Sequence, residues 1–136
     1  MENSLIVMDT DVIIDFFSDV APGAEIVSEL VSHRKAATTC ISIFELYSGV
    51  LGKRRLRQIE MLIDHLALLP LDVIGAATAG RIYTQLSSKG QLIGTHDILI
   101  GAICLAYDLP LYTRNVGHFS KIKNIRILSA RDILKS

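Results

Sequence analysis

The first apolar run of the chain is Leu5-Ile6-Val7-Met8, and it leads without a break into Asp9-Thr10-Asp11-Val12-Ile13-Ile14-Asp15. Four consecutive apolar residues are typical of a strand buried on both faces, as the central strands of parallel sheets are. Asp9 would then stand at the carboxyl end of this strand, the edge where open α/β sheets bind ligands. Thr10 or Asp11 can also cap the helix expected over residues 12–17, so turn and cap chemistry is the alternative explanation.

Strands and helices alternate along the rest of the chain. Helices are predicted over residues 24–33, 42–50, 53–66, 73–88, 96–107 and 130–134 (the last capped by Ser129), and strands over residues 36–41, 68–71, 111–113 and 125–128. Because Pro70 interrupts the strand 68–71, that strand is expected at a sheet edge. The alternation predicts an α/β fold, a three-layer α/β/α sandwich around a parallel sheet of about five strands. Residues 1–136 are expected to form a single domain.

The composition excludes a global attraction to polyanions, because 14 lysines and arginines balance 14 aspartates and glutamates. Cys40 and Cys104 lie in apolar runs without the spacing of a zinc site, which predicts two buried thiols in a reducing compartment. Residues 1–4 lack the basic region of a signal peptide, and no uninterrupted apolar run reaches the ~18 residues of a membrane span. We therefore expect a soluble cytoplasmic protein with no membrane contact.

Two further acids follow at positions that correspond to Asp9. Glu45 comes after the second predicted strand and Asp97 after Thr95, each in the first turn of a predicted helix. Structural explanations exist for both: Ser42 and Glu45 have the spacing of a capping box, and an acid near a helix N-terminus gains about 0.3–1 kcal/mol from the helix dipole. The helix after Asp97 is apolar on nearly every side, however, so this acid is expected to face a cleft.

Convergence of Asp9, Glu45 and Asp97 in one cleft would be unfavourable without a cation, because neighbouring carboxylates repel one another and lose solvation. Hard oxygen ligands of this kind suit Mg²⁺ or Mn²⁺ and phosphoryl chemistry. A fourth polar group follows the predicted strand 111–113. In this group Thr113 and Asn115 offer neutral oxygens, Arg114 offers a guanidinium for phosphate, and His118 offers an imidazole. Each of these residues also fits a structural role, as a turn residue or a partly buried polar side chain.

The segments that contain Asp9, Glu45, Asp97 and the group after the strand 111–113 follow one another in an order that resembles the PIN domain. Within that family they resemble the VapC-type toxin ribonucleases of type II toxin–antitoxin systems. The resemblance rests on residues 7–15 (VMDTDVIID), 42–49 (SIFELYSG), 97–102 (DILIGA) and 111–119 (LYTRNVGHF), and it covers nearly the whole chain. It implies a metal-dependent endoribonuclease in which Asp9, Glu45 and Asp97 hold Mg²⁺ or Mn²⁺ and a metal-activated water hydrolyses RNA phosphodiesters. It also implies a homodimer and a small cognate antitoxin that occludes the site.

The chain departs from the family pattern in one respect. Members commonly have a fourth acid near the position of Asn115 or of His118, and neither residue is acidic here. The three ligands are unaffected by this difference, whereas the pattern does not support a second metal. The residues expected to assist the three acids are Thr10, Asp11, Ser42, Thr113, Asn115 and His118.

Substrate binding requires positive charge near the acids. The densest basic run is Lys53-Arg54-Arg55-Leu56-Arg57, for which a solvent-exposed helix face is the preferred explanation. Arg114 neighbours the predicted site and is the better candidate for a contact with RNA phosphate.

Two other functions fit parts of the sequence. Asp9-Thr10-Asp11-Val12 matches the D-x-D-x-[TV] opening of haloacid-dehalogenase-type phosphatases, in which Asp9 would be a nucleophile. The late acidic pair of that family is missing after the strand 111–113. The other alternative is a catalytically reduced PIN-like binding or dimerisation module, which the missing fourth acid supports.

Overall fold

Five parallel strands form the sheet of the molecule in a computed structural model, which describes residues 4–135. β1 (Ile6–Met8) is central, with β2 (Ala36–Thr39) and β3 (Ala67–Leu69) on one side and β4 (Leu111–Tyr112) and β5 (Ile127–Leu128) on the other. All four neighbouring pairs are parallel. The predicted five-stranded parallel sheet is therefore confirmed, with β3 at an edge. The first three residues, on which the expectation about a signal peptide partly rests, lie outside the described range.

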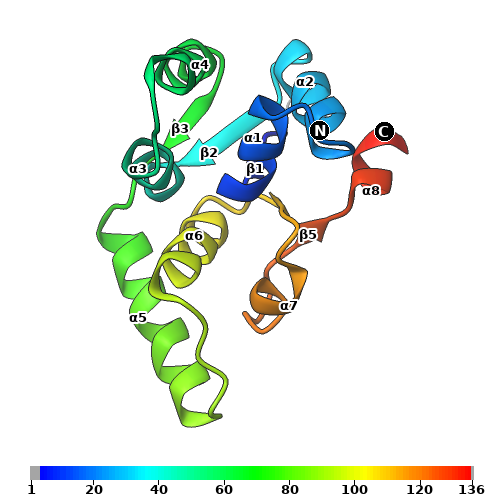
Figure 1. The fold of residues 1–136 in the computed structure, drawn as a ribbon. Coiled ribbons are helices and arrows are strands. Elements are labelled where there is room, and N and C mark those ends of the chain that lie inside the picture. The colour runs from blue at the N-terminus through cyan, green and yellow to red at the C-terminus, as the bar shows by residue number, and fades with distance from the viewer. Residues whose placement is uncertain (1–3, 136) are drawn as a thin grey trace.

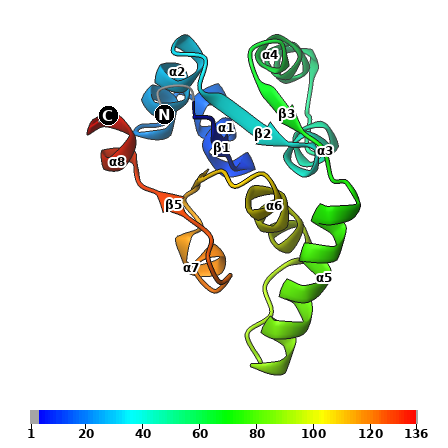
Figure 2. The ribbon, with the colours of Figure 1, turned by 180° about the vertical axis from the view of Figure 1, so that it is seen from behind.

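Helices cover both faces of this sheet (Figures 1 and 2). One face carries α1 (Thr10–Phe17), α2 (Gly23–Ser32), α4 (Lys53–Ile63) and α8 (Ala130–Lys135), and the other carries α5 (Val73–Ser88), α6 (Thr95–Ala106) and the short α7 (Val116–Phe119). α3 (Cys40–Ser48) follows β2 at the carboxyl edge and adds side chains to both layers. This arrangement is the predicted three-layer α/β/α sandwich.

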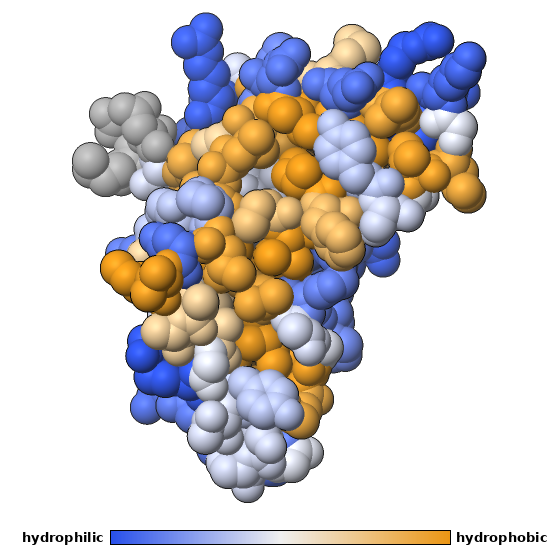
Figure 3. Space-filling view, turned by 90° about the vertical axis from the view of Figure 1, so that its left-hand side faces the viewer, coloured by the Kyte–Doolittle hydropathy of each residue, from blue (hydrophilic) through white to orange (hydrophobic). Residues whose placement is uncertain are grey.

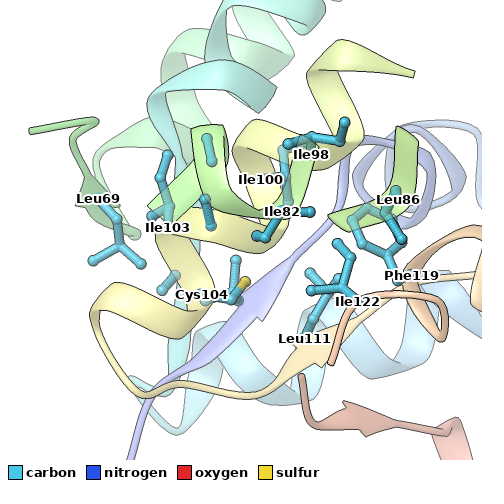
Figure 4. Close-up of a cluster of buried hydrophobic side chains, with 14 residues drawn as sticks. Leu69, Ile82, Leu86, Ile98, Ile100, Ile103, Cys104, Leu111, Phe119 and Ile122 are labelled. Atoms are coloured by element: carbon cyan, nitrogen blue, oxygen red, sulfur yellow. The ribbon is translucent and has the colours of Figure 1, made fainter. Parts of the chain in front are cut away.

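Successive residues of β1 enter opposite layers of the core. Met8 packs with Val12 and Ile13 of α1, whereas Val7 belongs to the cluster around α5 and α6. Figure 4 shows this second cluster, in which Leu111 of β4 lies beneath the apolar side chains of α6 and the Phe119–Ile122 segment. Val7 and Met8 are both completely buried. Because helices cover both faces of β1, the strand requires apolar residues at consecutive positions rather than at alternate ones.

The element boundaries differ from the predictions mainly around α3 and α7. The second strand ends at Thr39, and Cys40 already begins α3, so the prediction of two buried thiols is wrong for Cys40, which is exposed. Cys104 is buried in α6 as predicted. α5 has the predicted bounds, whereas α7 was not predicted, because its four residues are too few to show a helical period.

No helix in the described part of the chain is long and apolar enough to cross a membrane.

The chain changes its direction across the sheet between β1 and β4. It passes outward from β1 through β2 to β3, and then returns to β4 on the opposite side of β1. At such a topological switch point the loops after the two neighbouring strands diverge and leave a crevice at the carboxyl edge. Asp9 directly follows β1 and Thr113 directly follows β4, so both residues stand at this crevice.

Candidate active site

Asp9 lies at the switch point, directly after β1, with both carboxylate oxygens hydrogen-bonded. The backbone N–H of Thr10 donates to Oδ1 (2.8 Å), and the hydroxyl of Thr113 donates to Oδ2 (2.7 Å). Asp9 is itself the N-cap of α1, so the cap is neither Thr10 nor Asp11. Its side chain is almost completely buried. Burial, together with repulsion from Asp11 and Asp97, raises the pKa of Asp9 to about 7.

Asp11 places a second carboxylate beside the first, from the opening turn of α1. Its Oδ2 accepts a hydrogen bond from the backbone N–H of Arg114 (3.1 Å). Its Oδ1 is buried and has no hydrogen-bond partner among the described residues. Burial also raises the pKa of Asp11. The crevice therefore holds two carboxyl groups that are difficult to ionise together.

The N-terminus of α3 differs from the predicted capping box. Thr39 is the N-cap, and its hydroxyl accepts a hydrogen bond from the backbone N–H of Ser42 (3.1 Å). Ser42 lies inside the helix, fully buried, and its own hydroxyl has no partner among the described residues. The capping box of Ser42 and Glu45 is therefore wrong, because the N-cap of the helix lies three residues earlier, at Thr39, than that spacing suggested.

Glu45 is instead turned toward the crevice, where two side chains from other elements hold it. The hydroxyl of Thr10 donates to Oε1 (2.5 Å), and Nδ1 of His96 lies 2.9 Å from Oε2. His96 was not among the predicted site residues. The available signal was its place next to Asp97 in the first turn of α6, but the contact with Glu45 joins residues 51 positions apart and has no local pattern.

Asp97 is held at the other side of the crevice by the segment after β4. Its Oδ2 lies 2.9 Å from Nδ1 of His118 and accepts a hydrogen bond from the Asn115 side-chain amide (3.2 Å). The same amide lies 2.8 Å from Nδ1 of His118. Since one imidazole nitrogen cannot both donate to a carboxylate and accept from an amide, no tautomer satisfies all three contacts.

Arg114, which was predicted to contact RNA phosphate, is paired with an acid of α1. Its Nε and Nη2 contact the two carboxylate oxygens of Asp15 at 2.7 and 3.3 Å. A Cβ on Gly23 would lie 2.8 Å from the Cβ of Asp15, so this position in α2 must lack a side chain for Asp15 to reach Arg114. The ion pair and the backbone bond to Asp11 together fix the segment after β4 against α1.

Hydrogen bonds connect the three predicted acids in one network. It runs from Glu45 through Thr10 to Asp9 and on to Thr113. The backbone N–H of Asn115 donates to the Thr113 hydroxyl (2.9 Å), and the side-chain amide of Asn115 then donates to Asp97, which completes the path. Within residues 4–135, no three His, Cys, Asp or Glu side chains already form a metal cage, and the acids are joined through hydroxyl and amide groups.

The chemistry of this donor set fits a divalent cation. Carboxylate oxygens suit Mg²⁺ or Mn²⁺, and two imidazoles, those of His96 and His118, lie beside these oxygens. The raised pKa of Asp9 and the unpaired oxygen of Asp11 show carboxylates crowded closely enough for a positive charge to stabilise them.

A groove leads away from Glu45 over the surface. Its first part, about 280 Å³, is lined among others by Glu45, Leu51 and Arg55. Its second part, about 390 Å³, shares Leu51 and Arg55 and adds Arg54 and Phe17. The basic start of α4, whose Lys53, Arg54 and Arg57 are exposed as expected, therefore borders the two hollows that lead to Glu45.

Comparison with known proteins places this arrangement in a family. The family model described as PIN domain matches residues 6–125. The chain is 26% identical over 122 residues to Ribonuclease VapC1 of Methanocaldococcus jannaschii, a match that covers 90% of this chain and 84% of that protein. It is 30% identical over 95 residues to the tRNA(fMet)-specific endonuclease VapC of Salmonella typhimurium, covering 65% of this chain and 72% of that protein. The crystal structure of DNA-bound VapBC from Salmonella typhimurium superimposes with a TM-score of 0.81 at 25% identity, over 93% of this chain and 98% of that chain.

Proposed function

This chain belongs to the PIN-domain family and is a VapC-type ribonuclease, the toxin of a toxin–antitoxin pair; from this premise we propose that it cuts RNA at the crevice beside Asp9. The observation that carries the proposal is the network that joins Asp9, Glu45 and Asp97 at the topological switch point. Because the chain belongs to the PIN-domain family, we no longer consider the alternative of a haloacid-dehalogenase-type phosphatase in which Asp9 would be a nucleophile.

The family is typically metal-dependent. We propose Mg²⁺ or Mn²⁺ as the cofactor, held by Asp9, Glu45 and Asp97, with His118 and Asn115 beside the last of these. When bound, the cation neutralises phosphate charge and lowers the pKa of water.

The chain's own residues orient this site. Thr113 holds Asp9 through its hydroxyl, and Thr10 and His96 hold the two oxygens of Glu45. Glu45 is thus placed to take a proton from the attacking water. Asp11 adds negative charge next to Asp9. Ser42, fully buried one helical turn before Glu45, supports the start of α3.

The test of the active site is Asp9→Asn. The substitution keeps the size of the side chain and an acceptor oxygen but removes the negative charge, so we expect RNA cleavage to be lost with the fold retained. Asp64→Asn, an exposed acid at the end of α4, is the matched control and should cleave at the wild-type rate. Cleavage at the wild-type rate by folded Asp9→Asn would refute the assignment.

We propose three partners for this chain: RNA, a small antitoxin and a second copy of the chain. Residues 1–136 are proposed to form a single domain that acts in the cytoplasm. The Salmonella typhimurium neighbour is a VapBC assembly. An antitoxin segment in the groove between Glu45 and Arg55 would cover a proposed metal ligand. We expect Leu51→Glu, at the centre of the groove, to weaken antitoxin binding in a pull-down with the protein encoded beside this chain.

Dimerisation is supported by an apolar surface along α5. This helix lies at the outer side of the molecule (Figure 1), and a continuous hydrophobic band crosses the face on which α3 and α5 lie (Figure 3). Val73 and Ile74 at the start of α5 are 84% and 66% exposed. A second copy would cover these side chains. Ile74→Asp should convert a dimer into a monomer in analytical ultracentrifugation; an unchanged mass would place the interface elsewhere.

A further inference from the structure

We infer that Phe44 and His96 form a platform on which a nucleobase of the RNA stacks beside the cleavage site; this inference rests on the proposed function. Phe44 immediately precedes Glu45 in α3, and its side chain is 58% exposed. Single exposed apolar side chains are common on protein surfaces. What distinguishes Phe44 is that its neighbours belong to the crevice.

The two rings are fixed against the proposed active site. The centroids of Phe44 and His96 are 5.6 Å apart, with an angle of 86° between the ring planes. The same imidazole holds Glu45 through its Nδ1 at 2.9 Å. In an edge-to-face pair at most one face of either ring touches the other ring, so at least one face of Phe44 is not covered by His96.

A nucleobase fits this exposed ring face. An RNA whose phosphodiester lies at Glu45 carries a base on each side of the bond that is cut, and one of them lies within a nucleotide's length of Phe44. Every base has a π-face, so stacking on an aromatic side chain stabilises bound RNA with little dependence on sequence. Phe44 is therefore assigned to substrate binding, and not to the chemistry of cleavage.

The experiment measures binding of single-stranded RNA without turnover. The full chain carrying Asp9→Asn is titrated with an RNA in which fluorescent 2-aminopurine replaces the base on one or the other side of the mapped cleavage site. We expect stacking to quench the fluorescence at one of these positions. Phe44→Leu, which keeps an apolar side chain but no ring, should abolish the quench and raise Kd on the order of ten-fold. Phe44→Trp should restore both.

Two further measurements separate a stacking role from a structural one. In the chain with Asp9 intact, Phe44→Leu should raise KM for RNA while leaving kcat and the Mn²⁺-induced rise in Tm unchanged. Tyr107→Leu is the matched control, since Tyr107 is also a partly exposed aromatic but lies at the opposite end of α6. It should behave like the parent protein.

The outcomes distinguish this inference from the proposed function. If the wild-type chain cuts RNA and Phe44→Leu binds it with the same Kd and the same quench, the platform is refuted while the ribonuclease stands. Weakened antitoxin binding by Phe44→Leu with unchanged RNA binding would also refute the platform and assign the ring to a protein contact. If the folded wild-type chain neither binds nor cuts RNA, both proposals fail.

Discussion

Single carboxylates in the crevice have properties that their sequence positions do not reveal. The pKa of Asp9 is raised to about 7 from an ordinary value of 3.8, because the side chain is buried and faces Asp11 and Asp97. The pKa of Asp11 is raised as well, again mainly by burial. Both carboxyl groups are therefore harder to ionise in the folded, metal-free chain than in the unfolded chain, and either a proton or a cation can supply the positive charge that they lack.

This preference predicts a pH dependence of stability. Between pH 3.8 and about 7 the folded chain keeps a proton on Asp9 that the unfolded chain releases, so the free energy of unfolding falls as the pH rises through this window. The loss from Asp9 alone is at most roughly 4 kcal/mol. Urea unfolding in EDTA at pH 5 and at pH 8 measures the part of this loss that falls above pH 5, about 2.7 kcal/mol.

Asp9→Asn is the control for this pH dependence, because it cannot ionise. The variant should show a flatter pH profile and be more stable than the wild-type chain at pH 8 in EDTA. An identical slope for both proteins would mean that Asp9 is ionised throughout the window.

Arg114 can act by positioning the segment after β4 or by contacting phosphate, and the two roles predict different behaviour. If its ion pair with Asp15 is what matters, Arg114→Ala and Asp15→Ala should weaken RNA binding equally, and the double variant should be no worse than either. If Arg114 contacts phosphate, only Arg114→Ala should reduce the dependence of binding on salt. Titrations at several salt concentrations decide between these outcomes, and unchanged affinity and salt slope in Arg114→Ala would exclude both roles.

At the scale of elements, the start of α3 determines where Glu45 points. Thr39 caps this helix, and the Ser42 hydroxyl, one turn later, is buried without a partner among the described residues. We expect Thr39→Ala to lower the free energy of unfolding by about 1 kcal/mol and to reduce cleavage by loosening Glu45. Ser42→Ala should be neutral or stabilising, because it removes an unsatisfied buried polar group and favours the helix.

The two α3 variants form a matched pair, measured by urea unfolding and RNA cleavage. A larger loss of stability for Ser42→Ala than for Thr39→Ala would contradict Thr39 as the N-cap and would support the capping box that the sequence spacing suggested.

At the scale of the whole molecule, metal binding should stabilise the native chain, because the unfolded chain does not bring the three acids together. At a cation concentration of about 100 times Kd, the stabilisation is about 2.7 kcal/mol, or a rise in Tm of roughly 10 °C. Thermal unfolding with and without Mn²⁺ or Mg²⁺ checks this, and Asp9→Asn should lose most of the shift. No shift at saturating metal in the wild-type chain would contradict the proposed cofactor.

The amino-acid pattern alone was sufficient for the architecture. The consecutive apolar residues of β1, the helical period of α5 and the alternation of elements all depend on neighbours a few positions away, and these local preferences predicted the layers, the central strand and the edge strand. The acids at strand ends were visible for the same reason, since a change from apolar to charged residues marks where a strand leaves the core.

The folded chain was needed to show what each polar side chain contacts. Thr113 reaches Asp9 across 104 positions and Thr10 reaches Glu45 across 35, so neither bond leaves a local pattern. For Glu45, local spacing favoured a capping box, but the core aligned α3 so that the side chain meets Thr10 and His96. Local propensity acts within a helical turn, whereas the partners of a side chain at the crevice depend on how the sheet brings distant strand ends together.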